Sequence, residues 1–211
     1  MRGYLTPKVF MKHLKQARNL WQIKGILNSI GVMGQESPAL AVDVFHLTAA
    51  MTAMTRRGRT ADALDIFKYG FAKYGVEPNA FSYSAAITAC EKERQWELAL
   101  ELFDEMQHRG VSPDVVTYSS VISACEKCGQ WQHALDLFDE LERKGAEGMP
   151  SSARWSNAAD VILYSATISA CEKGGQWKRA VELLRQMEDV GLVPNVVTYS
   201  AAISACGNGH E

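Results

Sequence analysis

Residues 115–131 of the chain read VVTYSSVISACEKCGQW, and residues 161–177 read VILYSATISACEKGGQW. The similarity extends beyond these stretches and divides most of the chain into copies of one unit. The copies span residues 44–79 (the most divergent), 80–114, 115–160, 161–195 and, as a C-terminal half-repeat, 196–211. Tandem units of about 35 residues are typical of helical-repeat proteins, so this repetition decides the fold.

Two segments depart from the regular period. The 115–160 copy has 46 residues where its neighbours have 35, and the excess at about 146–159 is rich in small and turn residues. We expect a surface loop there, because loop entropy grows slowly with length. Residues 1–43 are basic, with six Lys and Arg against two acidic residues. They are expected to form an N-terminal helical cap or a degenerate repeat, with an import signal as the alternative.

Composition excludes several classes of protein. With 47% hydrophobic residues the chain can bury a core, and 22 Lys and Arg against 24 Asp and Glu give no overall signal for a nucleic-acid or membrane partner. No apolar run approaches the roughly 20 residues that span a bilayer, so we expect no membrane partner.

Each copy shows helical periodicity twice, which predicts two helices separated by a polar break. The first helix of the 80–114 copy has its apolar residues at Tyr83, Ala86, Ile87 and Cys90, and the second at Trp96, Ala99, Leu100, Phe103 and Met106. Gly and Pro in "RGVSPD" or "VGLVPN" end each copy. Because one such pair cannot bury both of its faces, the pairs are expected to stack on one another.

The cysteines follow the repeat. Cys90, Cys125, Cys171 and Cys206 occupy the same position in successive copies, which favours reduced thiols in the core over disulfides. Cys125, Cys128 and His133 lie near one another in sequence, but a structural zinc site needs four ligands. No metal and no cofactor is predicted.

The copies resemble the pentatricopeptide repeat (PPR) family in their recurring Tyr, Ile and Lys, in the Ala-Leu-x-Leu-Phe run, and in the Gly and the closing Pro-Asp or Pro-Asn. The resemblance covers residues 44–206, and none of the first helices has the Trp, Leu-Gly and Tyr pattern of the tetratricopeptide repeat. It implies an all-α fold, a right-handed α-solenoid of helix-turn-helix repeats. It also implies binding of single-stranded RNA, one base per repeat, in a chloroplast or mitochondrion.

In that family, the fifth and last residues of each repeat select the base. Carried over, these base-recognising pairs are Thr48 with Asn79, Ser84 with Asp114, Ser119 with Asp160, and Ser165 with Asn195. A carboxylate accepts from N1–H and N2–H of guanine, whereas an amide both donates to and accepts from adenine, so the implied core is 5′-AGGA-3′. The alternative is that these Asp and Asn residues only cap the helices that follow them.

Two further sets of residues suit RNA. Position two of each copy is a large apolar residue that the family would stack on a base, with core packing as the alternative: Phe45, Phe81, Val116, Ile162 and Val197. Cations late in each first helix are candidates for phosphate contacts, with favourable helix-dipole placement as the alternative: Arg56, Lys92, Lys127 and Lys173.

No catalytic residues are predicted, because the chain shows neither a nucleophile with a base nor a phosphate-binding loop. The leading hypothesis is an RNA-binding array acting in organellar RNA processing, stability or translation. Four bases give weak binding, so further repeats, a protein partner or self-association would assist. The alternative is a helical-repeat scaffold for protein–protein interaction.

Overall fold

The computed structural model describes residues 7–17, 22–28, 42–146 and 158–208, and all its regular elements within these ranges are helical. The chain forms two compact units, Met1–Glu93 and Arg94–Glu211. The boundary falls between the two predicted helices of the 80–114 copy. The predicted all-α fold of helix-turn-helix repeats is confirmed.

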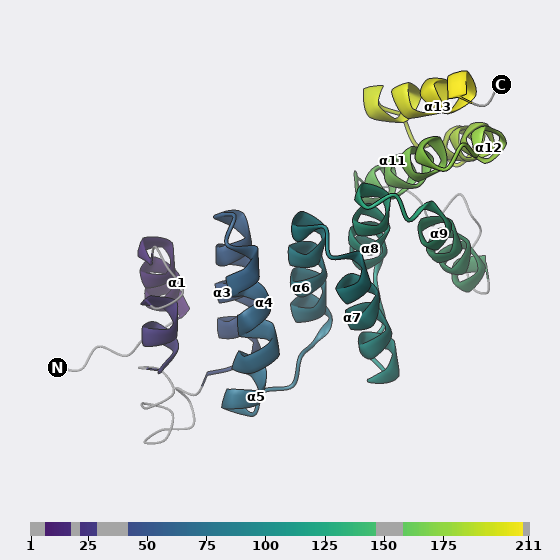
Figure 1. The fold of residues 1–211 in the computed structure, drawn as a ribbon. Helices are drawn as coiled ribbons and strands as arrows, with labels where there is room; N and C mark the ends of the chain where they lie inside the picture. Colours follow the sequence, from purple (N-terminus) through teal and green to yellow (C-terminus); the bar gives the residue numbers. More distant parts are fainter. Residues whose placement is uncertain (1–6, 18–21, 29–41, 147–157, 209–211) are drawn as a thin grey trace. The chain divides into compact units, whose positions relative to one another are not determined.

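The first unit contains α1 (Pro7–Gln16), a helical segment at 22–28, α3 (Val44–Arg56) and α6 (Ala80–Glu93). Between α3 and α6 runs a longer helical stretch made of α4 (Thr60–Asp65), the π-helical turn η2 (Ile66–Gly70) and α5 (Phe71–Tyr74). The first helices of successive repeats lie side by side, because α3 contacts α1 on one side and α6 on the other (Figure 1).

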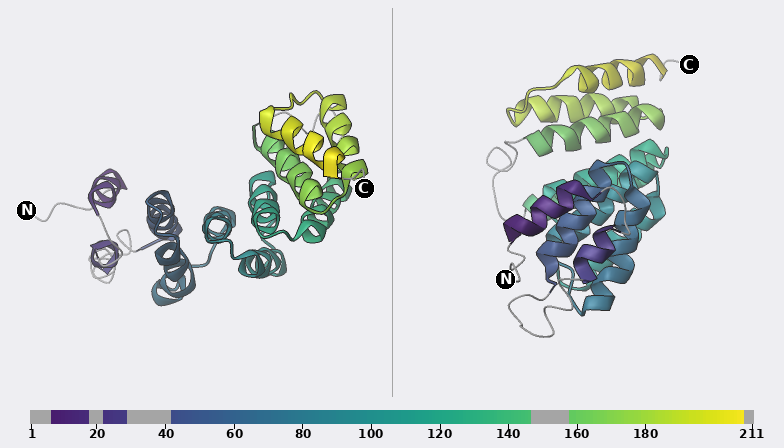
Figure 2. Two further views of the ribbon diagram at one scale, coloured as in Figure 1. Left: turned by 45° about the horizontal axis from the view of Figure 1, so that its top comes forward. Right: turned by 90° about the vertical axis from the view of Figure 1, so that its left-hand side faces the viewer.

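The second unit contains α7 (Trp96–His108), α8 (Val115–Lys127), α9 (Trp131–Ala146), α11 (Ala158–Lys173), α12 (Trp177–Asp189) and α13 (Val196–Asn208). Within it, α11 lies between α8 and α13, and α12 packs against both α11 and α13 (Figure 2). The predicted pairs of helices are therefore confirmed here. The predicted loop at about 146–159 lies mostly outside the described residues.

The turns between helices use the predicted glycines. Gly110 follows α7 with a φ of 73°, in the left-handed region that favours glycine. Its N–H and that of Val111 donate to the carbonyls of Gln107 and Met106, which closes the end of α7. The helix thus ends where the "RGVSPD" signal predicts.

The core is built by an aromatic contact that recurs between repeats. The Phe in the second helix of one repeat meets the Tyr in the first helix of the next, edge to face, with ring centroids about 5 Å apart. The pairs are Phe67 with Tyr83 at 5.2 Å, Phe103 with Tyr118 at 4.9 Å, and Phe138 with Tyr164 at 5.0 Å. The three Tyr side chains are almost completely buried, so each repeat completes the core of its neighbour.

Cys90, Cys125 and Cys171 are fully buried and are free thiols, as predicted. Burial raises the pKa of Cys90 and Cys125 to about 12 and that of Cys171 to about 11. Cys206, on the last described helix α13, is only half-buried.

One predicted core residue is wrong. Leu100 is half-buried, whereas Leu102 is buried beside Ala99, Phe103 and Met106. Residues 99, 102, 103 and 106 share one face of a helix with 3.6 residues per turn, and residue 100 lies off that face.

Two of the Trp residues that open second helices, Trp96 and Trp131, contact the neighbouring repeat. Trp96 stacks on the His133 ring of the next repeat, with ring centroids 5.3 Å apart. Trp131 lies against Gly174, where an added Cβ would meet the indole at 2.5 Å. Only glycine fits at position 174 without a shift of the indole.

Candidate nucleic-acid interface

The position-two residues form an exposed apolar set. Their exposed fractions are 49% for Phe45, 76% for Phe81, 50% for Val116, 55% for Ile162 and 60% for Val197. In each copy from 44 to 195 the residue two positions later, Leu47, Tyr83, Tyr118 or Tyr164, is buried. Large apolar side chains at the same exposed position in five copies are not core residues, so core packing does not explain them.

Three of the predicted last-position residues cap the following helix. The Oδ1 atoms of Asn79, Asp114 and Asn195 accept from the backbone N–H of the residue three positions on, at 3.1, 2.8 and 3.0 Å respectively. Capping is therefore real. All three side chains are nevertheless exposed, and within the described residues neither the Nδ2 groups of the two Asn nor Oδ2 of Asp114 makes a hydrogen bond. Each of these side chains thus has a polar atom left for a ligand.

Asp160 is different, and its predicted place immediately before a helix is wrong. Helix α11 begins at Ala158, so Asp160 lies inside its first turn, where the residue is completely buried. In the other copies, the residue three positions after the last-position Asp or Asn is Ser, Thr or His. After Asp160 this residue is Leu163. An Asp at this place offers no side chain to the surface.

The fifth-position hydroxyls lie deeper than the last-position residues. Thr48 and Ser84 are half-buried, and Ser119 and Ser165 are buried. The Oγ of Ser165 lies 2.7 Å from Oγ1 of Thr198, which in turn donates to Oδ1 of Asn195 at 3.1 Å. One shared hydroxyl thus joins two residues that are 30 positions apart in the sequence and that were predicted to recognise the same base.

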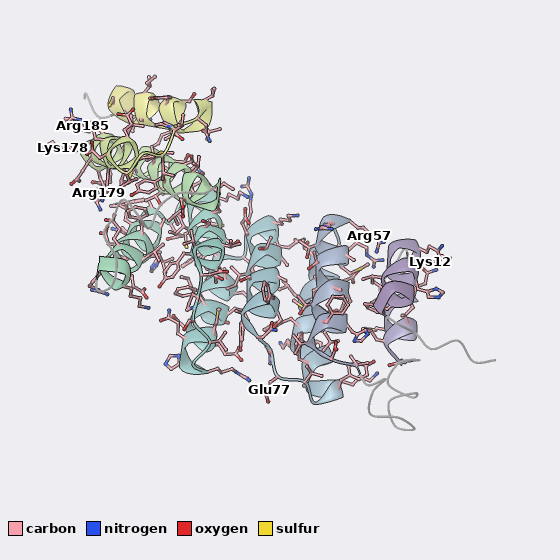
Figure 3. All side chains as sticks on the ribbon, turned by 180° about the vertical axis from the view of Figure 1, so that it is seen from behind. Lys12, Arg57, Glu77, Lys178, Arg179 and Arg185 are labelled. Carbon is pink, nitrogen blue, oxygen red and sulfur yellow. The ribbon has the colours of Figure 1, made fainter. Side chains whose placement is uncertain are left out.

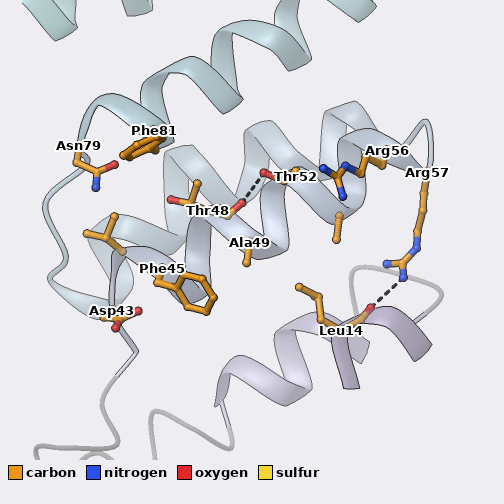
Figure 4. A pocket seen from close by; sticks show the side chains of 12 residues that line it. Leu14, Asp43, Phe45, Thr48, Ala49, Thr52, Arg56, Arg57, Asn79 and Phe81 are labelled. Carbon is orange, nitrogen blue, oxygen red and sulfur yellow. Dashed lines mark hydrogen bonds between the residues drawn. The ribbon is translucent and has the colours of Figure 1, made fainter. Parts of the chain in front are cut away.

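The first unit holds a pocket of about 810 Å³ that brings predicted residues of three kinds together. Phe45 and Phe81 contribute the apolar surface, Thr48 and Asn79 the polar pair, and Arg56 the cation (Figure 4). Its remaining lining residues are Leu14, Asp43, Val44, Ala49, Thr52, Ala53 and Arg57. The volume lies in the range of ligand-binding clefts.

The predicted phosphate-contacting cations are exposed, but three of them, Lys92, Lys127 and Lys173, also interact within the protein. The Nζ of Lys92 donates to the Thr55 carbonyl at 3.5 Å, and that of Lys173 to the Glu126 carbonyl at 2.8 Å. Both carbonyls occupy position twelve of the preceding repeat, near the end of its first helix. Lys173 also pairs with the Glu126 carboxylate at 2.7 Å, while Lys127 is exposed. Within the described residues, Arg56 alone of the four makes no hydrogen bond or ion pair.

The second helices carry cations as well as acids. Lys178, Arg179 and Arg185 project from α12 (Figure 3). Arg179 bridges two acids, Asp139 on α9 at 2.6 Å and Glu182 on its own helix at 2.8 Å. This arrangement links second helices of neighbouring repeats rather than presenting a free cationic surface.

Two kinds of site find no support among the described residues. No three His, Cys, Asp or Glu side chains are grouped so that they could hold a metal ion there. No described helix has the length and apolar character needed to cross a bilayer.

Sequence reasoning missed two features of this interface. Asp43 precedes Val44 as Asn79 precedes Ala80, and its Oδ1 accepts from the His46 N–H at 3.0 Å in the same capping arrangement. The position-three residues Ser82, Thr117 and Thr198 complete the caps. The signal was present, because both features recur in register.

Solved structures resemble the chain over nearly all of its length. PPR10, solved in complex with an 18-nucleotide psaJ RNA element, matches with a TM-score of 0.63 and 27% identity over 94% of this chain. The nuclear proteinaceous RNase P 2 (PRORP2) of A. thaliana matches in fold with a TM-score of 0.65 and 16% identity over 97% of this chain. The chain spans only 29% of the first protein and 43% of the second.

Sequence comparison gives the family. None of the curated proteins matches the chain. The model of the PPR repeat family matches three times, at residues 78–127, 113–148 and 159–208. Together these matches cover more than half of the 211 residues and include Phe81, Val116, Ile162 and Val197 of the position-two set, whereas Phe45 lies outside them. The chain belongs to the PPR repeat family.

Proposed function

We propose that the chain binds single-stranded RNA, one base per repeat, with the preferred core 5′-AGGA-3′, and acts in the processing, stability or translation of organellar transcripts. The binding of an RNA element by PPR10 and the shared family support the general activity. The first, second and fourth bases follow from the side-chain chemistry of Asn79, Asp114 and Asn195, and the third follows from the residue type of Asp160 alone.

One observation carries the proposal, namely the pocket of the first unit. Phe45 and Phe81 are exposed apolar groups on adjacent first helices, and both line this pocket together with Thr48 and Asn79 (Figure 4). Apolar surface flanking an amide is what a base needs, because its faces stack while its edge forms hydrogen bonds. The amide Nδ2 of Asn79 donates and its Oδ1 accepts, which matches N1 and N6 of adenine.

The four bases are not expected to be selected equally. Asp114 is exposed and Asp160 is completely buried, so a carboxylate is presented to the second base but not to the third. We expect strong preference for guanine at the second position and the weakest discrimination of the four at the third.

Titration of labelled RNA tests the proposal directly. At low salt, AGGA should bind more tightly than AAAA, by about tenfold if one carboxylate–guanine contact is gained. Equal binding of the two RNAs would remove the base assignment and leave general RNA binding. Absence of binding to both would contradict RNA binding and favour a protein-binding scaffold.

A single substitution tests the assignment of the second base. Asp114→Asn keeps a capping side chain and should move the preference from AGGA to AAGA. Asp136→Asn is the matched control, because Asp136 is an exposed residue on the second helix α9 and removes the same charge. An unchanged preference in Asp114→Asn would show that this residue only caps.

A further inference from the structure

Helix α1 has the burial pattern of a first helix. Phe10, Leu14 and Ala17 are buried, with exposed fractions of 0%, 2% and 5%. Their spacing of four and then three residues is that of Tyr83, Ile87 and Cys90 in α6 and of Leu47, Met51 and Met54 in α3. If Phe10 is aligned with Tyr83, Pro7 occupies position one of the repeat. Helix α1 begins at Pro7, just as α6 begins at its own position-one residue, Ala80.

The contacts of this segment match those between later repeats. In α1, the Phe10 ring meets the His46 ring of α3 at 4.7 Å, and the Leu14 carbonyl accepts from Arg57 at 2.9 Å. In the 22–28 helix, Oδ1 of Asn28 accepts from both Lys73 and Tyr74 of α5, each at 2.7 Å. Helix α1 thus lies against the first helix of the next repeat, and the 22–28 helix lies against its second helix. The same arrangement recurs later in the chain, where α8 contacts α11 and Gln186 of α12 donates a hydrogen bond to Glu142 of α9.

Asp43 occupies the last position of this unit. Its side chain is 62% exposed, and only its Oδ1 atom is used in the capping contacts with His46. Asp43 lines the pocket whose lining runs from Leu14 on α1 to Phe81 on α6, with Phe45 between them (Figure 4). The pocket therefore continues beyond the surface that Phe45 and Phe81 share, toward α1.

We infer that α1 and the 22–28 helix are the helix pair of an additional repeat, and that Asp43 selects one more base, immediately 5′ of AGGA. This inference rests on the proposed function. The base is one with an imino N–H on its Watson–Crick edge, guanine or uracil, because a carboxylate only accepts hydrogen bonds. Adenine and cytosine present a lone pair at the corresponding ring nitrogen and are disfavoured. The fifth position of this repeat is Met11, a residue type that adds no hydroxyl.

The test compares four RNAs, 5′-NAGGA-3′ with N as A, C, G or U, together with AGGA. We expect the G and U forms to bind about tenfold more tightly than the A and C forms. In Asp43→Asn the order should change in favour of A, while the cap persists because Asn caps as well as Asp. The thermal unfolding midpoint checks that this variant folds as the wild type does. Asp65→Asn, an exposed charge on α4, is the matched control and should keep the wild-type order.

Two different failures are distinguishable. If AGGA is preferred over AAAA but all four NAGGA forms bind equally, the additional repeat does not select a base and the inference is overturned, while the proposed function stands. If AGGA itself is not preferred, the proposed base assignment fails and the inference fails with it.

Discussion

At the scale of single residues, the interface depends on short polar relays that hold exposed groups in place. Thr198 is completely buried and contacts both Ser165 and Asn195 through its hydroxyl. Its backbone N–H also donates to Asn195. The exposed amide of Asn195 is thus oriented from inside, and a buried threonine that touches no base is expected to affect base selection.

Thr198→Val tests this relay, because valine has the shape of threonine without the hydroxyl. Leaving Ser165 and Asn195 without this partner should lower the free energy of unfolding by about 1–2 kcal/mol and weaken the preference for AGGA over AGGG. Denaturant unfolding and RNA titration measure the two effects.

The control for this substitution is Thr167→Val. Thr167 is equally buried, but its hydroxyl bonds the Leu163 carbonyl within α11. It should lose similar stability and keep the wild-type preference. If both variants change base selection alike, the relay has no specific role.

At the scale of helices, the repeated cations have two separable tasks. Lys173 donates to the last turn of α8 through the Glu126 carbonyl and pairs with the Glu126 carboxylate, where a cation favours the helix dipole. Arg56 lines the pocket of the first unit and has no partner among the described side chains and carbonyls. Lys173 is therefore placed to join neighbouring repeats, and Arg56 is placed to contact a phosphate.

Arg56→Met and Lys173→Met should therefore behave differently. Arg56→Met should weaken binding of all RNAs and reduce the salt slope of log K by about 0.7, the value for one phosphate on a single strand. Lys173→Met should lower the free energy of unfolding by about 0.5 kcal/mol with a smaller change in the salt slope. Titrations at several salt concentrations and urea unfolding separate the two. A larger change in slope for Lys173→Met than for Arg56→Met would contradict this division.

The buried thiols make the first helices sensitive to alkaline pH. The unfolded chain loses the Cys125 proton near the ordinary pKa of 9.0, whereas the folded chain keeps it up to about 12. Between these values the unfolded state binds fewer protons, so the free energy of unfolding falls as the pH rises. The contribution of the Cys125 thiol to the free energy of unfolding is fully present below pH 9. Unfolding from pH 8 to 10.5 should show a smaller decline in Cys125→Ala than in the wild type, whereas Cys206→Ala, at a half-buried position, should follow the wild type more closely.

At the scale of the whole molecule, most of the repeat architecture could be predicted because packing recurs in register. The Tyr, Ile and Cys positions of α6, α8 and α11 are buried in each, and the same period places Phe81 or Val116 on the surface. The repeat period did not predict that Asp160 lies inside a helix, because α11, which follows the insertion, begins two residues earlier, at Ala158. The additional repeat was also left open, since its Phe10, Leu14 and Ala17 share the spacing of the other copies but not their residue types.

The polarity of the bound RNA is the last property of the whole array that can be tested. The core AGGA has the same order of bases in both directions, so it cannot distinguish parallel from antiparallel binding. The additional repeat breaks this symmetry, because Asp43 lies at the N-terminal end of the series Asn79, Asp114, Asp160 and Asn195. In the parallel orientation 5′-GAGGA-3′ should bind about tenfold more tightly than 5′-AGGAG-3′. The opposite order would indicate antiparallel binding, and Asp43→Asn should abolish the difference in either case, because the asymmetry is assigned to that one carboxylate.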